Sequence, residues 1–148
     1  MEVRRILVPI DGSPLSLRAA EVAGALAKRF DAGVTLLTAV DPPEAARSYV
    51  SETVLTEVRR GLGQAADQVL DQAQARISDQ QLKVEKKTEW GAPAPAIAAE
   101  ANRGYDLVVM GSRGLGVEAA EADFLGSVAQ RVLRRVRCPV LIIPEHRA

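Results

Sequence analysis

The fold is decided by the first strand and its turn, VRRILVPIDGSP at residues 3–14. Residues 3–10 are apolar apart from two arginines, a pattern typical of a strand that is buried on both faces of a sheet. Residues 11–14, Asp-Gly-Ser-Pro, end that strand. Ser13 is a favoured N-cap, and Pro14 suits the first position of a helix. The stretch therefore predicts a buried strand, a short turn and a helix.

The rest of the chain alternates buried apolar runs with helical apolar stripes. After the first strand we expect a helix with inward-facing Leu15, Ala19, Val22, Leu26 and Phe30, a strand at Val34–Val40, a helix from about Ser51 to Ile77, an edge strand at Leu82–Thr88, a helix at Pro93–Asn102, a strand at Tyr105–Met110, a helix carrying Val128, Val132 and Val136, and a strand at Cys138–Ile143. This alternation predicts an α/β fold, a single doubly wound parallel sheet with helices on both faces. We assign it to one domain spanning residues 1–148. Its ligand crevice should lie beyond the carboxyl ends of the strands, where the strand order reverses.

The long helix expected between Ser51 and Ile77 carries two glycines near its start. Gly61 and Gly63 each weaken a helix by about 1 kcal/mol relative to alanine, so we expect an irregularity there. The apolar stripe of this helix covers only about three heptads, which is short for a coiled coil. Packing on a sheet is therefore the expected use of the stripe.

Composition and charge exclude several classes of protein. Nineteen basic residues balance nineteen acidic ones, so we expect neither nucleic acid nor an anionic membrane as a partner. No apolar stretch approaches the roughly 20 residues that a membrane-spanning helix needs. The single cysteine, Cys138, rules out a disulfide within the chain and suits a reducing compartment. We expect a soluble, cytoplasmic protein.

The strongest local signal is a glycine-rich segment, VVMGSRGLGVEAAEADFLGSV at residues 108–128. A buried strand ends in Gly111, Gly114 follows closely, and Gly126-Ser127 opens a helix. Glycines let the backbone approach a ligand, and free N–H groups at a helix start attract anions. Spacing alone is equally compatible with a flexible turn and a helix that Ser127 caps. The segment is not a P-loop, since it lacks Gly-Lys-Ser or Gly-Lys-Thr, and its glycines do not form a dinucleotide fingerprint.

Several segments together resemble the universal stress protein family. Residues 6–13, ILVPIDGS, resemble the opening strand and turn of that family. Residues 107–114, LVVMGSRG, resemble its fourth strand and the first half of its phosphate loop. Gly126-Ser127-Val128 and the run from Cys138 to Ile143 resemble its closing helix and strand. The resemblance covers essentially the whole chain, and it implies five strands in the order 3-2-1-4-5, with a switch point between the first and fourth strands.

The resemblance implies a site for ATP or a related adenine nucleotide, with Mg²⁺ held by the phosphates and not directly by protein ligands. ATP-binding members carry a glycine, two residues, a second glycine, nine residues, then Gly-Ser or Gly-Thr. Asp11 matches an acidic residue near the ribose and adenine, and Val40 matches a position whose backbone contacts adenine. The nucleotide-binding residues so implied are Pro9, Asp11, Ser13, Val40, Gly111, Arg113, Gly114, Gly126, Ser127 and Val128.

Two positions depart from the family pattern. Leu115–Leu125 spans eleven residues, two more than the pattern, and includes Glu118, Glu121 and Asp123. Carboxylates pointing into a phosphate site would oppose binding by about 4 kcal/mol at close range, whereas carboxylates pointing to solvent would be screened. The second departure is Ala92, which stands where many relatives have aspartate before a helix-starting proline, so we expect weaker capping there.

Three hypotheses for function follow. The first is a stress-response regulatory protein that binds ATP or a related adenine nucleotide with little or no hydrolysis, because no general base is evident and we assign no catalytic residue. The second is a dimeric stress or interaction module that binds no nucleotide, which the acidic spacer motivates. The third is a protein that binds AMP or a cyclic nucleotide. The resemblance also implies a homodimer through Val140–Ile143, an apolar edge strand that pairing would cover.

Overall fold

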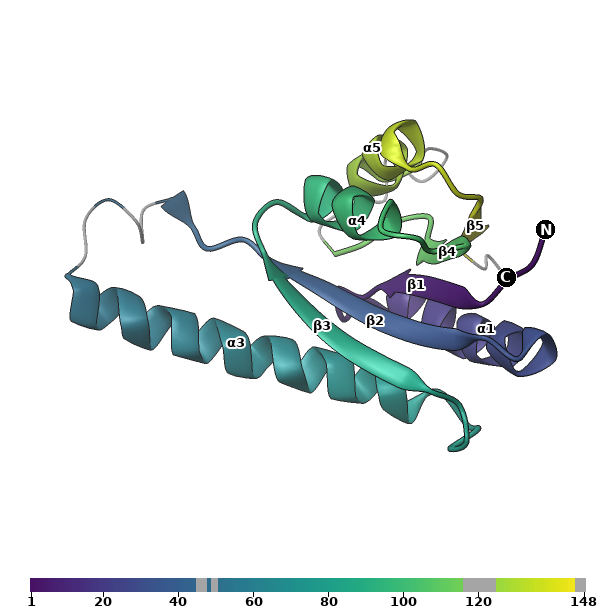
Figure 1. Cartoon of the computed structure of the whole chain (residues 1–148). Helices are drawn as coiled ribbons and strands as arrows, with labels where there is room; N and C mark the ends of the chain where they lie inside the picture. Colours follow the sequence, from purple (N-terminus) through teal and green to yellow (C-terminus); the bar gives the residue numbers. More distant parts are fainter. Residues whose placement is uncertain (45–47, 49–50, 116–124, 146–148) are drawn as a thin grey trace.

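A parallel sheet of five strands forms the centre of the protein (Figure 1). The computed structural model describes residues 1–44, 48, 51–115 and 125–145. Within them the strand order is β3-β2-β1-β4-β5, and all neighbouring strands are parallel. The doubly wound fold and the strand order implied by the resemblance are therefore confirmed. The strands are β1 Arg5–Pro9, β2 Gly33–Val40, β3 Val84–Trp90, β4 Leu107–Gly111 and β5 Val140–Ile143.

Helices cover both faces of the sheet. The helices α1 and α3 lie on one face and α4 and α5 on the other, and the amino-terminal part of α3 projects beyond the sheet (Figure 1). Layers of this kind result from strands and helices that alternate with right-handed crossovers. Among the described helices, none combines the length and the apolar character needed to cross a membrane. The bounds are α1 Pro14–Phe30, α3 Glu52–Ala75, α4 Pro93–Ala101 and α5 Ser127–Arg135.

Each face of the sheet has its own hydrophobic core. Alternation along β1 sends Ile6 and Val8 to the side of α1 and α3, and Leu7 to the side of α4 and α5. All three side chains are fully buried, and each contributes about 1.5–3 kcal/mol to stability. Val3 and Ile10 are buried as well although they lie outside β1, so the strand is shorter than the apolar run that predicted it. Burial on both faces gives the carboxyl end of β1 a set position.

The predicted first helix is confirmed, and so is most of its predicted inward face, since Ala19 is fully buried and Leu15, Val22 and Leu26 are partly buried against the core. Ser13 is the N-cap of α1, with its Oγ accepting a hydrogen bond from the Ser16 N–H at 3.2 Å, and Pro14 is the first helical residue. Phe30, predicted to face inward, is 49% exposed. Small side chains on α1 let its backbone lie close to the sheet. The buried residues are Ser16, Ala19, Ala20, Ala23, Gly24 and Ala27.

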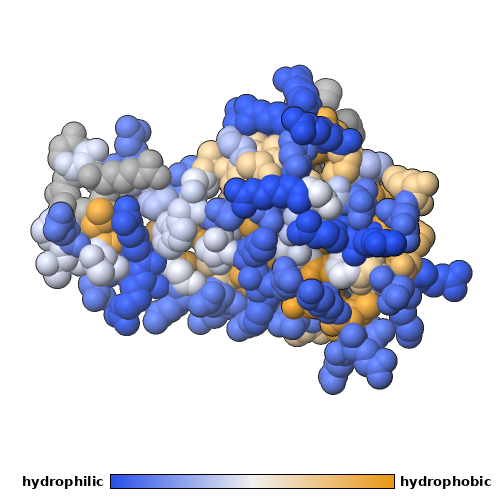
Figure 2. Space-filling view, viewed as in Figure 1, coloured by the Kyte–Doolittle hydropathy of each residue, from blue (hydrophilic) through white to orange (hydrophobic). Residues whose placement is uncertain are grey.

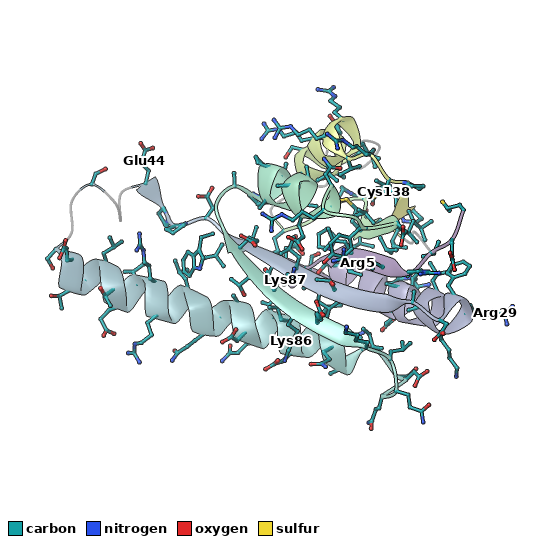
Figure 3. All side chains as sticks on the ribbon, viewed as in Figure 1. Arg5, Arg29, Glu44, Lys86, Lys87 and Cys138 are labelled. Carbon is teal, nitrogen blue, oxygen red and sulfur yellow. The ribbon has the colours of Figure 1, made fainter. Side chains whose placement is uncertain are left out.

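The edge strand β3 carries charged residues that alternate between the two faces of the sheet. It begins two residues later than predicted, at Val84. Lys86 donates a hydrogen bond to Asp71 of α3 at 2.7 Å, and Lys87 donates to Glu100 of α4, also at 2.7 Å (Figure 3). Lysines on an edge strand discourage pairing with other chains. The charges of β3 thus tie both helical layers to this edge of the sheet.

Glu100 is a buried carboxylate held by several donors. It is 3% exposed, and it accepts hydrogen bonds from Lys87 Nζ at 2.7 Å, Tyr105 Oη at 3.1 Å and Arg103 at 3.4 Å. Burial raises the pKa of Glu100, but the hydrogen bonds from Lys87 and Tyr105 and the nearby positive charges outweigh burial and lower that pKa below its ordinary value of 4.5. The hydrogen bond to Glu100 raises the pKa of Lys87. The pair is therefore charged throughout the neutral range.

This cluster predicts an acid dependence of stability. A carboxyl group whose pKa is lower in the folded chain stabilises the fold above the unfolded pKa, and that contribution disappears as pH falls through the folded pKa. We expect Glu100→Gln to lower the free energy of unfolding at neutral pH by about 1–3 kcal/mol. The difference from wild type should shrink below the ordinary pKa of 4.5, as measured by urea unfolding across a pH series. Glu85→Gln, at an exposed position of β3, is the control and should cost less than about 0.5 kcal/mol. A Glu100→Gln difference that is equally large in acid would contradict the assignment.

The predicted irregularity at Gly61 and Gly63 is wrong. Helix α3 continues unbroken from Glu52 to Ala75. Low propensity at two positions weakens a helix without interrupting it, because packing of an amphipathic face supplies most helical stability in proteins. Further along α3, the residues buried against the sheet are Ala66, Leu70 and Ala73.

Alanine at these two glycines should stabilise the protein. A methyl group added at Gly61 or Gly63 would meet no atom within 4 Å, so each substitution should raise the free energy of unfolding by about 0.5–1 kcal/mol in urea titrations. Gly24→Ala on α1 is the matched control. There the added carbon would lie 3.1 Å from Ile77 Cγ2, and the gain should be cancelled by crowding. A loss of stability in both α3 variants would contradict the prediction.

Candidate functional site

The two strands at the switch point separate toward their carboxyl ends. Strand β1 pairs with β2 over its whole length but with β4 only through Ile6 and Leu7. Pro9, the last residue of β1, has no N–H to donate. Ile10 instead continues along β2, with its N–H donating to the Leu37 carbonyl at 2.7 Å. The turn after β1 and the loop after β4 therefore border a crevice, at the place where open α/β sheets bind ligands.

Asp11 bridges the two sides of this crevice. Its Oδ1 accepts the Ser13 N–H at 2.9 Å, within its own turn. Its Oδ2 accepts the Leu115 N–H at 3.0 Å, across 104 positions of sequence. A methyl group at Gly114 would collide with the same carboxylate. Asp11 thus holds the loop after β4 against the turn after β1, and the loop can approach this closely because residue 114 is glycine.

The loop after β4 is also fixed from its other sides. Gly111 packs against α1, where an added Cβ would lie 2.8 Å from Leu15 Cβ. The Ser112 N–H donates to the Ile143 carbonyl of β5, and the Gly126 N–H donates to the Ser112 carbonyl, both at 2.8 Å. The two glycine-containing halves of the motif are therefore joined directly by a backbone hydrogen bond.

Helix α5 begins at the crevice without a side-chain cap. Gly126 is the N-cap, and no side-chain hydrogen bond closes the helix start. The interpretation of Ser127 as the cap is wrong, because Ser127 is the first helical residue and is exposed. Ser127, Val128 and Ala129 all line the crevice. N–H groups in the first turn of a helix carry partial positive charge and attract anions.

The crevice encloses about 240 Å³ and has an apolar wall and a polar rim. Leu37 and Ala39 of β2, Ile97 of α4 and Met110 of β4 contribute the wall. Sequence analysis missed these residues because their apolar runs do not differ from those of the core. Their position near the carboxyl ends of strands is the signal that identifies them once the strand order is known. An apolar wall with a few polar groups suits a ligand with an apolar part and an anionic part.

The structure brings nine of the ten predicted nucleotide-binding residues to this crevice. Val40 is the exception, since its neighbour Ala39 lines the crevice and the Val40 carbonyl accepts the Gly91 N–H at 2.9 Å. The contact of any of the ten with a ligand stays a prediction. The nine that line the crevice are Pro9, Asp11, Ser13, Gly111, Arg113, Gly114, Gly126, Ser127 and Val128.

The charges of the crevice are satisfied within the protein. Arg113 is the one basic side chain among the described lining residues, and its guanidinium forms an ion pair with Glu145. Asp11 is the one acidic side chain of that described lining, and both its oxygens accept backbone N–H groups. The lining that the structure describes contains no histidine or cysteine.

The long spacer of the motif lies mostly outside the described residues. Glu118, Glu121 and Asp123, on which the predicted conflict with a phosphate depends, belong to residues 116–124. Ala92, the other departure from the family pattern, is described. It is the N-cap of α4 and makes no side-chain capping hydrogen bond, so the predicted weak cap is confirmed.

Comparison with known proteins agrees with this geometry. Residues 2–144 match the sequence model of Usp, the Universal stress protein family. Universal stress protein MJ0531 of Methanocaldococcus jannaschii is 34% identical, over 96% of this chain and 82% of its own length. Nearly the whole of this chain therefore aligns with this relative.

Two solved structures share the fold. The hypothetical protein MJ0577 has a TM-score of 0.85 and 25% sequence identity, with complete coverage of both chains. A universal stress protein solved in complex with cAMP has a TM-score of 0.72 and 28% identity, over 97% of this chain and 98% of that chain. The matched residues include both glycine segments of the crevice and the Asp11 turn. This chain belongs to the universal stress protein family.

Proposed function

We propose that this protein is a stress-response regulatory protein that binds ATP or a related adenine nucleotide in the crevice between β1 and β4. The observation that carries the proposal is the uncapped start of α5, which lines the crevice beside the glycine-containing loop. N–H groups in the first turn of α5 can donate to phosphate oxygens. Close packing at Gly111, Gly114 and Gly126 brings further backbone to the same place. Mg²⁺ would bind through the phosphates, without a direct protein ligand.

The apolar wall supports the adenosine half of the proposal. Leu37, Ala39, Ile97 and Met110 line the crevice with apolar side chains, against which a base can pack. Asp11 has lone pairs left after its two backbone hydrogen bonds, because an ionised carboxylate has roughly four acceptor positions. It can therefore accept a ribose hydroxyl while it still holds the loop. Val40 would contribute through its backbone, as the resemblance implies.

Hydrolysis of the nucleotide is expected to be slow or absent. The lining that the structure describes offers one carboxylate, Asp11, and that group is engaged by the N–H groups of Ser13 and Leu115. A general base must reach the proton that it removes and accept it readily. A regulatory role through binding therefore fits better than turnover.

The single thiol, Cys138, is compatible with a reducing compartment, and we place the protein in the cytoplasm.

AMP or a cyclic nucleotide is the second candidate ligand. A relative with 28% identity over nearly the whole chain has been solved with cAMP. Both candidates use the same start of α5, and they differ in the number of phosphate charges that the rim must accept.

Nucleotide binding should be visible in thermal unfolding of nucleotide-free protein with and without ATP and Mg²⁺. A ligand at a hundred times its dissociation constant stabilises by about 2.7 kcal/mol, which is a rise in midpoint of roughly 5–10 °C for a chain of this length. Ser127→Asp should abolish the rise, because it places a carboxylate in the first turn of α5, next to any bound phosphate. The same carboxylate favours the helix start, so the variant without ligand should unfold no earlier than wild type.

The matched control is Ser127→Asn, because asparagine has the size of aspartate without its charge. This variant should keep the rise of the unfolding midpoint with nucleotide. AMP and cAMP are tested in the same series. No shift of the wild-type midpoint with any of the three nucleotides would contradict the proposal and would favour the alternative, a dimeric interaction module that binds no nucleotide. A shift that survives Ser127→Asp would place the nucleotide elsewhere on the protein.

We also propose that the protein is a homodimer through β5. Strand β5 is at an edge of the sheet, and its residues Val140, Leu141 and Ile142 are partly or largely exposed. An unpaired apolar edge strand invites pairing with another chain. Two β5 strands paired across a twofold axis would cover both edges at once.

Light scattering after size exclusion should give twice the chain mass of 15.8 kDa at micromolar concentration. Leu141→Lys should give the monomer mass, because it puts a charge on the paired edge. Leu133→Lys on α5 is the control, since Leu133 is 40% exposed and Leu141 is 39% exposed. A wild-type monomer, or equal masses for both lysine variants, would contradict the β5 dimer.

A further inference from the structure

Arg113 forms an ion pair with the segment that follows the last strand. Its guanidinium contacts the carboxylate of Glu145, and the exposed fractions of the two side chains are 9% and 51%. Glu145 lies two residues beyond Ile143, the last residue of β5. Ile143 is paired with Gly111, and its carbonyl accepts the Ser112 N–H at 2.8 Å. The register between β4 and β5 therefore brings Glu145 next to Arg113, which lines the crevice.

The ion pair leaves the crevice without an unpaired cation among its described lining residues. Arg113 is the one basic side chain of that lining, and Glu145 already neutralises it. Asp11 is occupied by the N–H groups of Ser13 and Leu115. An anionic ligand therefore meets backbone N–H groups at the start of α5, while Arg113, the one basic side chain of the described lining, already has a carboxylate partner.

Because the guanidinium of Arg113 is largely buried, its ion pair with Glu145 affects how strongly an anionic ligand can bind beside it. Arg4 and Glu2 form an ion pair with 74% and 73% exposed side chains, and water screens such pairs so strongly that they are worth little. Arg113 is largely removed from water, so its charge is felt more strongly by whichever anion lies beside it. Carboxylate and phosphate oxygens accept hydrogen bonds from the same guanidinium donors and thus compete for them.

We propose that Glu145 is a specificity-determining residue, an internal anion that sets which phosphate ligands the crevice accepts. The inference rests on the proposed nucleotide-binding function. A triphosphate must either displace Glu145 from Arg113 or bind with the Glu145 charge beside its own charges. A ligand with a single phosphodiester charge, such as cAMP, can bind to the α5 N–H groups while the ion pair persists. Glu145 therefore disfavours ATP relative to cAMP.

The test is calorimetric titration of the full chain with ATP and Mg²⁺, and separately with cAMP. Glu145→Gln keeps the size of the side chain and removes its charge. We expect its dissociation constant for ATP to fall by about tenfold, the effect of one charge-assisted hydrogen bond, while that for cAMP stays nearly unchanged. Glu2→Gln removes the same charge from an exposed ion pair just before β1 and should change neither constant. Glu145→Gln should lower the unfolding midpoint without ligand, because it leaves the largely buried guanidinium of Arg113 without its charged partner. Glu2→Gln should leave the midpoint unchanged, because its ion pair is exposed. The titrations are therefore run at a temperature at which all three proteins are folded.

The outcomes separate this inference from the function on which it rests. An unchanged ratio of the two dissociation constants in Glu145→Gln overturns the inference and leaves nucleotide binding in place. Binding of ATP by Glu145→Gln, when wild type binds neither nucleotide, overturns both the preference for cAMP and nucleotide binding by the native chain, because Glu145 then excludes both ligands. Binding of neither nucleotide by either protein overturns both.

Discussion

Asp11 lies between two segments that are far apart in the sequence, and its carboxylate bonds to both of them. One oxygen accepts an N–H of its own turn, from Ser13, and the other accepts the N–H of Leu115 in the loop after β4. Backbone donors left without partners are costly, so this carboxylate satisfies two donors and at the same time determines how far apart the two sides of the crevice lie. Gly114 permits the approach, because a Cβ there would collide with the carboxylate. The position of the loop, and hence the shape of the site, depends on this contact.

The two hydrophobic cores hold in place the turn from which Asp11 contacts the loop after β4. Side chains of β1 are buried on both faces of the sheet, so Pro9 and the turn that follows cannot shift without disturbing the α1–α3 core and the α4–α5 core together. The outer surface is mainly hydrophilic in the view of Figure 2, including the exposed faces of α3 and α5. The tightly packed residues thus lie in the two cores, and the hydrophilic residues lie on the outer surface. Binding sites are commonly formed by loops on a rigid scaffold of this kind.

Local sequence patterns predicted most elements, and their errors have a common cause. Helical periodicity placed Phe30 on the buried face of α1, glycine propensity predicted an irregularity at Gly61 and Gly63, and residue type gave Ser127 a capping role. The structure contradicts each of these. In each case a local preference was outweighed by packing or by a neighbouring residue. Small residues let α1 approach the sheet closely, packing supports α3 across its glycines, and Gly126 takes the cap position of α5. Local propensity is a weak guide wherever tertiary contacts compete with it.

The succession of strands and helices along the chain, the parallel sheet and the two glycine segments of the site could all be recognised in the sequence. These features follow from short-range patterns of apolar residues, glycine and proline, which can be recognised within a few residues. Three contacts of the site are visible only in the folded chain: Asp11 bonds to Leu115, Arg113 pairs with Glu145, and Ala39 lines the crevice in place of Val40. These contacts join residues on different elements, and their geometry depends on how β1, β4 and β5 are aligned with one another. No local pattern specifies that alignment, because it results from burying both faces of the whole sheet at once.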